Sequence, residues 1–244
     1  SPSLPSGLSF SATTGIISGT PSTVSSATTY TVTGTNSGGG ATATITILVN
    51  DAAPSSVTYS PNSFTLTKDV AMTSVTPTAS GGTVSSWAIS PTLPAGLSFD
   101  TSDGTISGTP TAVTSSTTFT VTATNAGGSG TATVTIQVND VPPYSVSYSG
   151  TPFTLTKGTA MTAVTPSASG GAVDSWTVSP TLPAGVTLDS STGVLSGTPT
   201  AIVSTTTYTI TATNTGGSAT AIVTIQVNVA PPSSITYNPS SHTM

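Results

Sequence analysis

The sequence has few ionisable side chains and no cysteine. Only 4% of its 244 residues are charged, as two lysines, seven aspartates and neither arginine nor glutamate, for a formal net charge of −5. Without cysteine it has no disulfides or thiolate metal sites, which fits a large exported bacterial or archaeal protein better than a small animal secreted domain. With two cations it lacks the basic surface that neutralises phosphates, so we expect neither nucleic acid nor anionic lipid as a partner.

Long apolar runs are also missing. No stretch approaches the roughly 18–20 consecutive apolar residues that cross a bilayer, so we expect no membrane insertion within this segment. The start, SPSLPSG, has no basic stretch followed by an apolar one, which indicates a soluble, already processed chain. Glycine and proline, at 24 and 19 residues, stay below the share typical of low-complexity chains, so we expect a folded protein.

One line of sequence occurs three times. The strings LPSGLSFSATTGIISGTP, LPAGLSFDTSDGTISGTP and LPAGVTLDSSTGVLSGTP begin at Leu4, Leu93 and Leu182, 89 residues apart, and the register has no insertion or deletion. Proline-containing linkers follow a long alternating strand in each copy and mark the seams. The predicted domains are the C-terminal part of a module (1–53), two complete modules (54–142 and 143–231) and the first strand of a further module (232–244).

Within a module the apolar residues recur with a period of two. In TTFTVTATN and TATVTIQVN (from Thr117 and Thr131) apolar residues alternate with threonine, which predicts half-buried antiparallel strands joined by a turn at NAGGSG. Upstream of this pair, turn signals every 8–12 residues separate shorter candidate strands. The sequence predicts an all-β fold of tandem sandwich modules, with upstream strands at 57–59, 64–67, 72–76, 86–90, 97–100 and 104–107.

The quoted strings, followed by TFTVTATN and TATVTIQV, resemble the immunoglobulin-like (cadherin-like) repeats of large bacterial and archaeal surface proteins, adhesins among them. The resemblance covers both complete modules and the half-module. It implies Ig-like β-sandwiches in an extracellular array and no single biochemical activity.

Candidate chemical groups are few. The one histidine, His242, falls where other copies have phenylalanine, and no acid, base and nucleophile recur together, so we expect no enzyme and no catalytic residue. Asp51 and Asp140 precede the linker prolines, and Asp100 and Asp103 lie in the repeated line, which makes them weak calcium candidates. The alternative is that all four form turns or end strands, because the third linker has valine and the first copy of the line has no acid.

Two further interpretations concern lysine and tryptophan. Lys68 with Asn125, and Lys157 with Asn214, are candidates for isopeptide bonds of the kind that Gram-positive pilin modules contain, although no partnering acid recurs. Each complete module also has one tryptophan, at Trp87 and Trp176, which is predicted to lie in the core rather than to form a sugar-stacking platform.

The outward rows of threonine carry almost no charge and lack the lysines that usually protect strands from association. We therefore expect self-association, lateral or head-to-tail, or a coat of O-linked glycans. One form of self-association is head-to-tail strand donation, in which residues 232–244 of one chain supply a strand to the half-module of another. The sequence favours a structural region of an extracellular filament, stalk or sheath, the alternative being an adhesin module that recognises glycan or a host or neighbour-cell protein.

Overall fold

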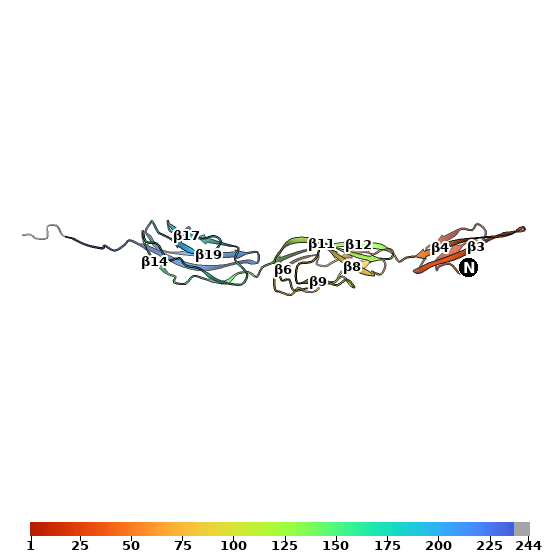
Figure 1. The fold of residues 1–244 in the computed structure, drawn as a ribbon, viewed down its shortest axis with the longest axis horizontal. Helices are drawn as coiled ribbons and strands as arrows, with labels where there is room; N and C mark the ends of the chain where they lie inside the picture. Colours follow the sequence, from red (N-terminus) through yellow and green to blue (C-terminus); the bar gives the residue numbers. More distant parts are fainter. Residues whose placement is uncertain (237–244) are drawn as a thin grey trace, which may run out of the picture. The chain divides into compact units, whose positions relative to one another are not determined.

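Residues 1–236 are described by a computed structural model (Figure 1). They contain 20 β-strands and no helix, as predicted from the alternating pattern. The chain divides into two compact units, of which the first comprises residues 1–66 and 70–137 and the second residues 67–69 and everything from 138 onward. The N-terminal half-module contains β1 (Leu8–Phe10), β2 (Ile17–Gly19), β3 (Ser25–Asn36) and β4 (Gly39–Val49).

The two complete modules have the same order of strands. The middle module consists of β5 (Ser55–Thr58), β6 (Ser63–Thr67), β7 (Thr78–Ser80), β8 (Ser86–Ser90), β9 (Leu97–Phe99), β10 (Ile106–Gly108), β11 (Thr114–Asn125) and β12 (Gly128–Asn139). The last module consists of β13 (Tyr144–Ser147), β14 (Phe153–Thr156), β15 (Ser167–Ser169), β16 (Ser175–Ser179), β17 (Val186–Leu188), β18 (Leu195–Gly197), β19 (Val203–Asn214) and β20 (Gly217–Asn228).

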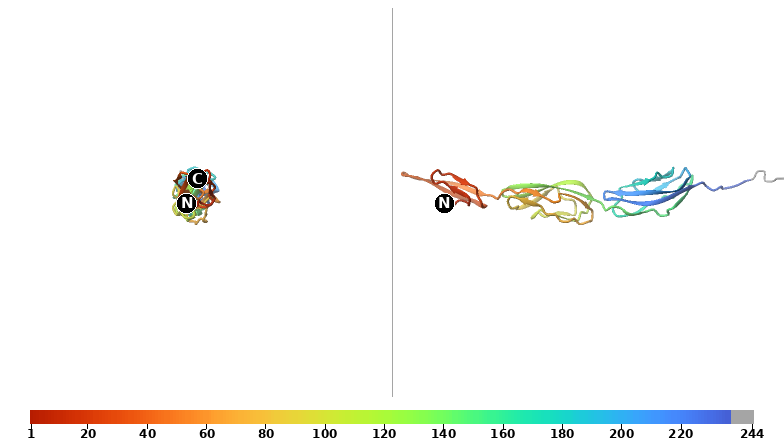
Figure 2. Two further views of the ribbon diagram at one scale, coloured as in Figure 1. Left: turned by 90° about the vertical axis from the view of Figure 1, so that its right-hand side faces the viewer. Right: turned by 180° about the vertical axis from the view of Figure 1, so that it is seen from behind.

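Each complete module is built on a four-stranded sheet, in the order β6-β12-β11-β8 or β14-β20-β19-β16. In the last module β19 pairs antiparallel with both β20 and β16, whereas β14 pairs parallel with β20 from Phe153 opposite Ile225 to Thr156 opposite Asn228. Strand pairs β13–β15 and β17–β18 form the second layer (Figure 2). Val164, in the segment between β14 and β15, makes an isolated bridge to Leu195 in β18.

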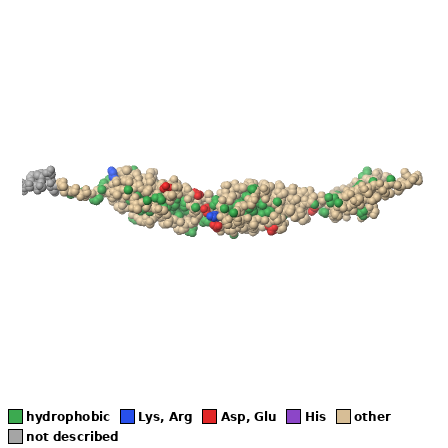
Figure 3. Space-filling view, in the orientation of Figure 1, with side chains coloured by type: hydrophobic (Ala, Val, Ile, Leu, Met, Phe, Trp, Pro, Cys, Tyr) green, Lys and Arg blue, Asp and Glu red, His purple; other side chains and the backbone are tan. Residues whose placement is uncertain are grey.

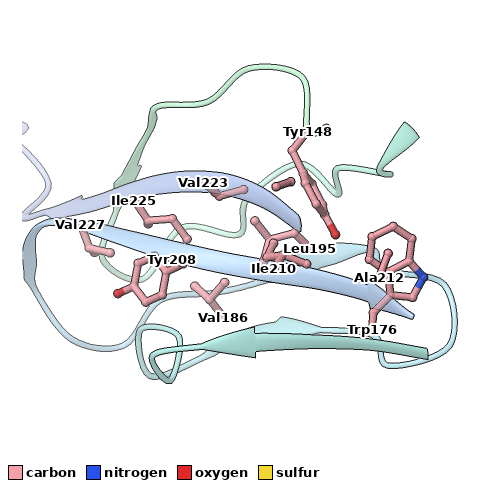
Figure 4. Close-up of a cluster of buried hydrophobic side chains, with 11 residues drawn as sticks. Tyr148, Trp176, Val186, Leu195, Tyr208, Ile210, Ala212, Val223, Ile225 and Val227 are labelled. Atoms are coloured by element: carbon pink, nitrogen blue, oxygen red, sulfur yellow. The ribbon is translucent and has the colours of Figure 1, made fainter. Parts of the chain in front are cut away.

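The core of the last module lies between these layers. The alternation of β19 and β20 places one side chain in two inward, so Ile210, Val223, Ile225 and Val227 are fully buried. Leu195 from the second layer is also fully buried. Tyr148 and Trp176 lie together at one end of the cluster (Figure 4).

The predicted strand at 72–76 is wrong. In the structure Val75 makes one isolated bridge to Ile106, and the third short strand of the module is β7, after Pro77. Proline has no N–H to continue the ladder, so pairing does not run through residue 77. Residues 232–236 form no strand, and the rest of the expected terminal strand, with His242, lies outside the described residues.

The hairpin of the half-module has the same register as that of the complete modules, but its inward side chains are less buried. Val32 and Ile45 are half-buried, whereas their counterparts Val121 and Val134 are fully buried. Phe10 is 43% exposed. Residues 1–50 do not include counterparts of β5–β8, so a hollow lined by Leu4, Leu8, Phe10, Ile17 and Tyr30 is the uncovered core of this half-module.

Candidate functional site

The linker before the middle module is docked onto that module. Residues 51–54 run beside the turn that joins β11 and β12, where the side-chain amide of Asn125 donates to the Ala52 carbonyl oxygen at 2.7 Å. The carboxylate of Asp51 accepts from the backbone N–H of Ala52 at 2.9 Å and from that of Thr83 at 2.8 Å. These bonds span up to 73 residues of sequence and fix the linker to loops of the module that follows it.

The last module holds its linker in the same way. The Asn214 amide donates to the Val141 carbonyl oxygen at 2.8 Å, and Gly171 N–H donates to the same oxygen at 3.0 Å. Asp140 accepts from Val141 N–H through its carboxylate and donates its own N–H to the Thr215 hydroxyl, both at 2.9 Å. We call this arrangement the linker clamp in both modules. The predicted boundaries at 53/54 and 142/143 therefore assign these linker residues to the module before them, although they bind the module after them.

Glycine is required on both sides of each clamp. A β-carbon on Gly127 or Gly216 would overlap the carbonyl oxygen of the first linker residue. A β-carbon on Gly82 or Gly171 would overlap that of the second. The GG pairs thus bring two loops close enough to hold the linker backbone between them.

Asn125 and Asn214 are the central side chains of the clamps. Each is buried, and its oxygen accepts the N–H groups of the two glycines that follow in its own turn, at 2.8–3.2 Å, while its amide points to the linker. From the sequence, these residues were predicted only to form a turn or an isopeptide bond. The signal available was their recurrence, always two residues before a GG pair.

The structure does not bring Lys68 and Asn125 together. Lys68 N–H donates to the carbonyl oxygen of Asn139, the last residue of β12, whereas Asn125 lies at the turn where β12 begins. Twelve strand residues separate those ends by about 35–40 Å. Lys157 and Asn214 are separated in the same way, by β20. The isopeptide alternative therefore fails on distance.

Aspartates in the repeated line close a tight turn. Asp100 accepts from Ser102 through its backbone N–H at 2.8 Å and its hydroxyl at 2.6 Å, and Asp189 accepts in the same way from Ser191. In the first copy Ser11 replaces the acid and accepts from the N–H of Thr14 at 3.3 Å. These contacts are those of a turn-forming residue.

The calcium candidates are not gathered into a site. Asp51 and Asp140 belong to the linker clamps, while Asp100 and Asp103 accept from N–H groups of their own turn. Across residues 1–236 no three histidine, cysteine or acidic side chains lie close enough to hold a metal ion together. Calcium at these residues stays a prediction.

The turn aspartates should make stability depend on pH in the acid range. Hydrogen bonds from the Ser191 hydroxyl, then from the backbone N–H groups of Thr192 and Ser191, hold the pKa of Asp189 well below its ordinary value of 3.8. The carboxylate therefore stabilises the fold fully above that ordinary value, and its contribution is lost as pH falls through the folded-state pKa. In thermal melts, Asp189→Ala should melt below the wild type at pH 7, and the difference should shrink at pH 2.

Asp189→Asn is the matched control, because its amide oxygen still accepts the turn N–H groups but does not titrate. It should retain most of the wild-type stability at pH 7. An equal gap between Asp189→Ala and the wild type at both pH values would contradict the assignment.

The tryptophans lie in the core, as predicted, so the alternative that they form a sugar-stacking platform is wrong. Trp87 and Trp176 are 8% and 6% exposed. Tyr148 packs edge-on against Trp176, with ring centroids 6.4 Å apart, and donates its hydroxyl to the Gly193 carbonyl oxygen at 2.5 Å. A β-carbon on Gly193 would lie 2.6 Å from the indole. Burial raises the pKa of Tyr148 to about 12, so the hydroxyl stays protonated and can donate even in alkaline solution.

The outward side of the β14-β20-β19-β16 sheet is covered by hydroxyl-bearing side chains, and we call it the threonine face. Facing pairs across the central hairpin include Thr207 with Thr224 and Thr211 with Thr220, with Thr209 opposite Ile222. The half-module has the same arrangement, with Thr29, Thr31 and Thr33 opposite Thr46, Thr44 and Thr42.

No helix within residues 1–236 is long and apolar enough to cross a membrane.

Two solved multi-domain fragments illustrate the structures to which this chain is similar. A three-Ig fragment of titin aligns over 95% of this chain and 84% of its own, with 16% identity and a TM-score of 0.46. Extracellular domains 3–5 of Drosophila OTK align over 93% of this chain and 78% of their own, with 20% identity and a TM-score of 0.43.

Curated relatives and a family profile also match. A Staphylococcus aureus protein (strain MRSA252) named serine-rich adhesin for platelets is 35% identical over 125 residues, 47% of this chain and 8% of that protein. The protein of the same name in strain USA300 is also 35% identical over 125 residues, which make up 5% of its length. The chain therefore spans a small part of the length of these relatives. The profile of a family described as "Putative Ig domain" matches residues 1–50, 46–139 and 138–228.

Proposed function

Because the chain belongs to this Ig-domain family, as tandem modules similar to part of a bacterial surface adhesin, we propose that it is a non-enzymatic structural region of an extracellular stalk or filament. In this role each module transmits tension between its two ends and needs no cofactor. The observation that carries the proposal is the way in which both ends of a complete module are fastened.

At the entry of the last module, tension acts on the linker clamp. At the exit, tension acts on the parallel pairing of β14 with β20, which Lys157 N–H extends by donating to the Asn228 carbonyl oxygen at 2.8 Å. Pulling back on the start of β14 while pulling forward on the end of β20 loads these parallel hydrogen bonds together, in shear. Several bonds must then break at once, which suits a module under load.

Single-molecule pulling tests this role. The wild-type chain should show two unfolding events at similar force, each releasing up to about 300 Å of extended chain for an 89-residue module. Lys157→Pro removes one bond of the exit pairing and should lower the force of one event only. The middle module, whose Lys68 N–H donates to Asn139, is the control inside the same molecule. Two unchanged events in the variant would contradict the load path.

The alternative is a binding module of an adhesin that recognises glycan or a host protein. The 35% identity with part of the serine-rich adhesin favours it. Saturable binding of the wild-type chain on a glycan array, combined with low unfolding forces, would favour recognition over load bearing.

A further inference from the structure

The threonine face of the last module has an apolar centre. Ile222 lies between Thr220 and Thr224 along β20 and opposite Thr209, and it is 58% exposed. The corresponding residue of the middle module, 89 positions earlier, is Thr133. In this module a large aliphatic side chain therefore points to solvent from the middle of a sheet face rather than from a loop.

Threonines surround Ile222 on this face. In the two other modules, corresponding hydroxyl groups pair with each other across the hairpin, Thr29 with Thr46 at 3.2 Å and Thr118 with Thr135 at 3.3 Å. A hydroxyl that bonds to its neighbour in the sheet leaves the methyl group to face outward. In the last module the corresponding residues are Thr207 and Thr224, which lie opposite each other across the same hairpin.

The face carries no charged side chain. Its outward positions on the four strands are threonine, serine, glutamine, asparagine and isoleucine, and the neighbouring charges, Asp174 and Lys157, lie just beyond the ends of β16 and β14. Figure 3 shows how sparse charged atoms are on the side of the molecule it presents. Two copies of this face can approach without like-charge repulsion.

We propose that the threonine face of the last module pairs face to face with the same face of a second copy of the chain, with Ile222 at the centre of the contact. Sheets packed in this way lie about 10 Å apart with their side chains interdigitated. From strand lengths and spacing the face measures roughly 500 Å², below the roughly 800 Å² per partner of a standard stable interface. Pairing through this face is therefore weak and concentration-dependent.

Sedimentation equilibrium of the unglycosylated full chain tests the proposal. The wild type should show a concentration-dependent dimer, and Ile222→Lys should raise its dissociation constant by at least about tenfold, because two-fold symmetry brings the new charges of both copies close together. Ile202→Lys is the matched control, since Ile202 is the same residue with the same 58% exposure but lies in the loop before β19. It should leave the dissociation constant unchanged, and circular dichroism should show all three proteins folded.

A wild type that stays monomeric to about 100 μM, where even weak specific pairs assemble, would overturn the pairing. Equal weakening by both lysines would also overturn it. So would a glycan that binds the wild type and is lost with Ile222→Lys while no dimer forms. The pairing does not depend on load bearing: the pulling experiment examines single molecules, so either idea can fail while the other stands.

Discussion

Replacing Leu195 by alanine is expected to lower the free energy of unfolding of the last module by about 2–5 kcal/mol. Leu195 is fully buried and is the residue through which β18 bridges to Val164. Truncation removes its apolar contacts and leaves a cavity in the core between the two layers. The two tryptophans of the chain lie in different modules, so Trp176 fluorescence in a Trp87→Phe background reports denaturant unfolding of the last module alone.

The matched control is Ile106→Ala, the same deletion 89 residues earlier, in the middle module. In the Trp87→Phe background it should leave the Trp176 transition where it was. A loss below about 1 kcal/mol for Leu195→Ala would mean that the site collapses around the smaller side chain, contrary to a closely packed core.

Gly216→Val is expected to release the linker from the last module. The new side chain would occupy the position of the Asp140 carbonyl oxygen, so the linker must leave and the Asn214 amide loses its bond to Val141. Two to three hydrogen bonds of about 1 kcal/mol each disappear. Exchange of the Gly171 amide proton, which the Val141 carbonyl oxygen accepts, should accelerate by at least about tenfold.

Gly127→Val tests the specificity of this effect, because Gly127 contacts the other linker, at Asp51. It should leave exchange at Gly171 unchanged and accelerate exchange at Gly82, whose N–H donates to Ala52. Unchanged protection of Gly171 in Gly216→Val would show that the linker does not need the glycine.

Features set by local pattern were predictable from the sequence. Alternation identified β11, β12 and their turn, and the one tryptophan of each complete module was correctly predicted to be buried. The 89-residue recurrence of the repeated line predicted tandem modules, which the family matches confirm.

Features that depend on contacts between distant segments were not predictable in this way. Asn125 reaches Ala52 across 73 residues, and no periodicity in either segment encodes that meeting. The isopeptide hypothesis failed for a related reason. The sequence offered Lys68 and Asn125 as partners but gave no information about their positions along the sheet, and the structure puts them at opposite ends of β12.

The linker clamp has a consequence for how such arrays lengthen and shorten during evolution. Because each linker is recognised by loops of the module downstream, a recombination event preserves every junction only if it carries the linker with its recipient. The exchangeable unit is therefore 51–139 or 140–228, beginning at the aspartate, rather than a segment cut at the prolines. Duplicating a segment with these boundaries keeps each linker joined to the module whose loops bind it. The number of repeats can then change while every linker clamp is preserved.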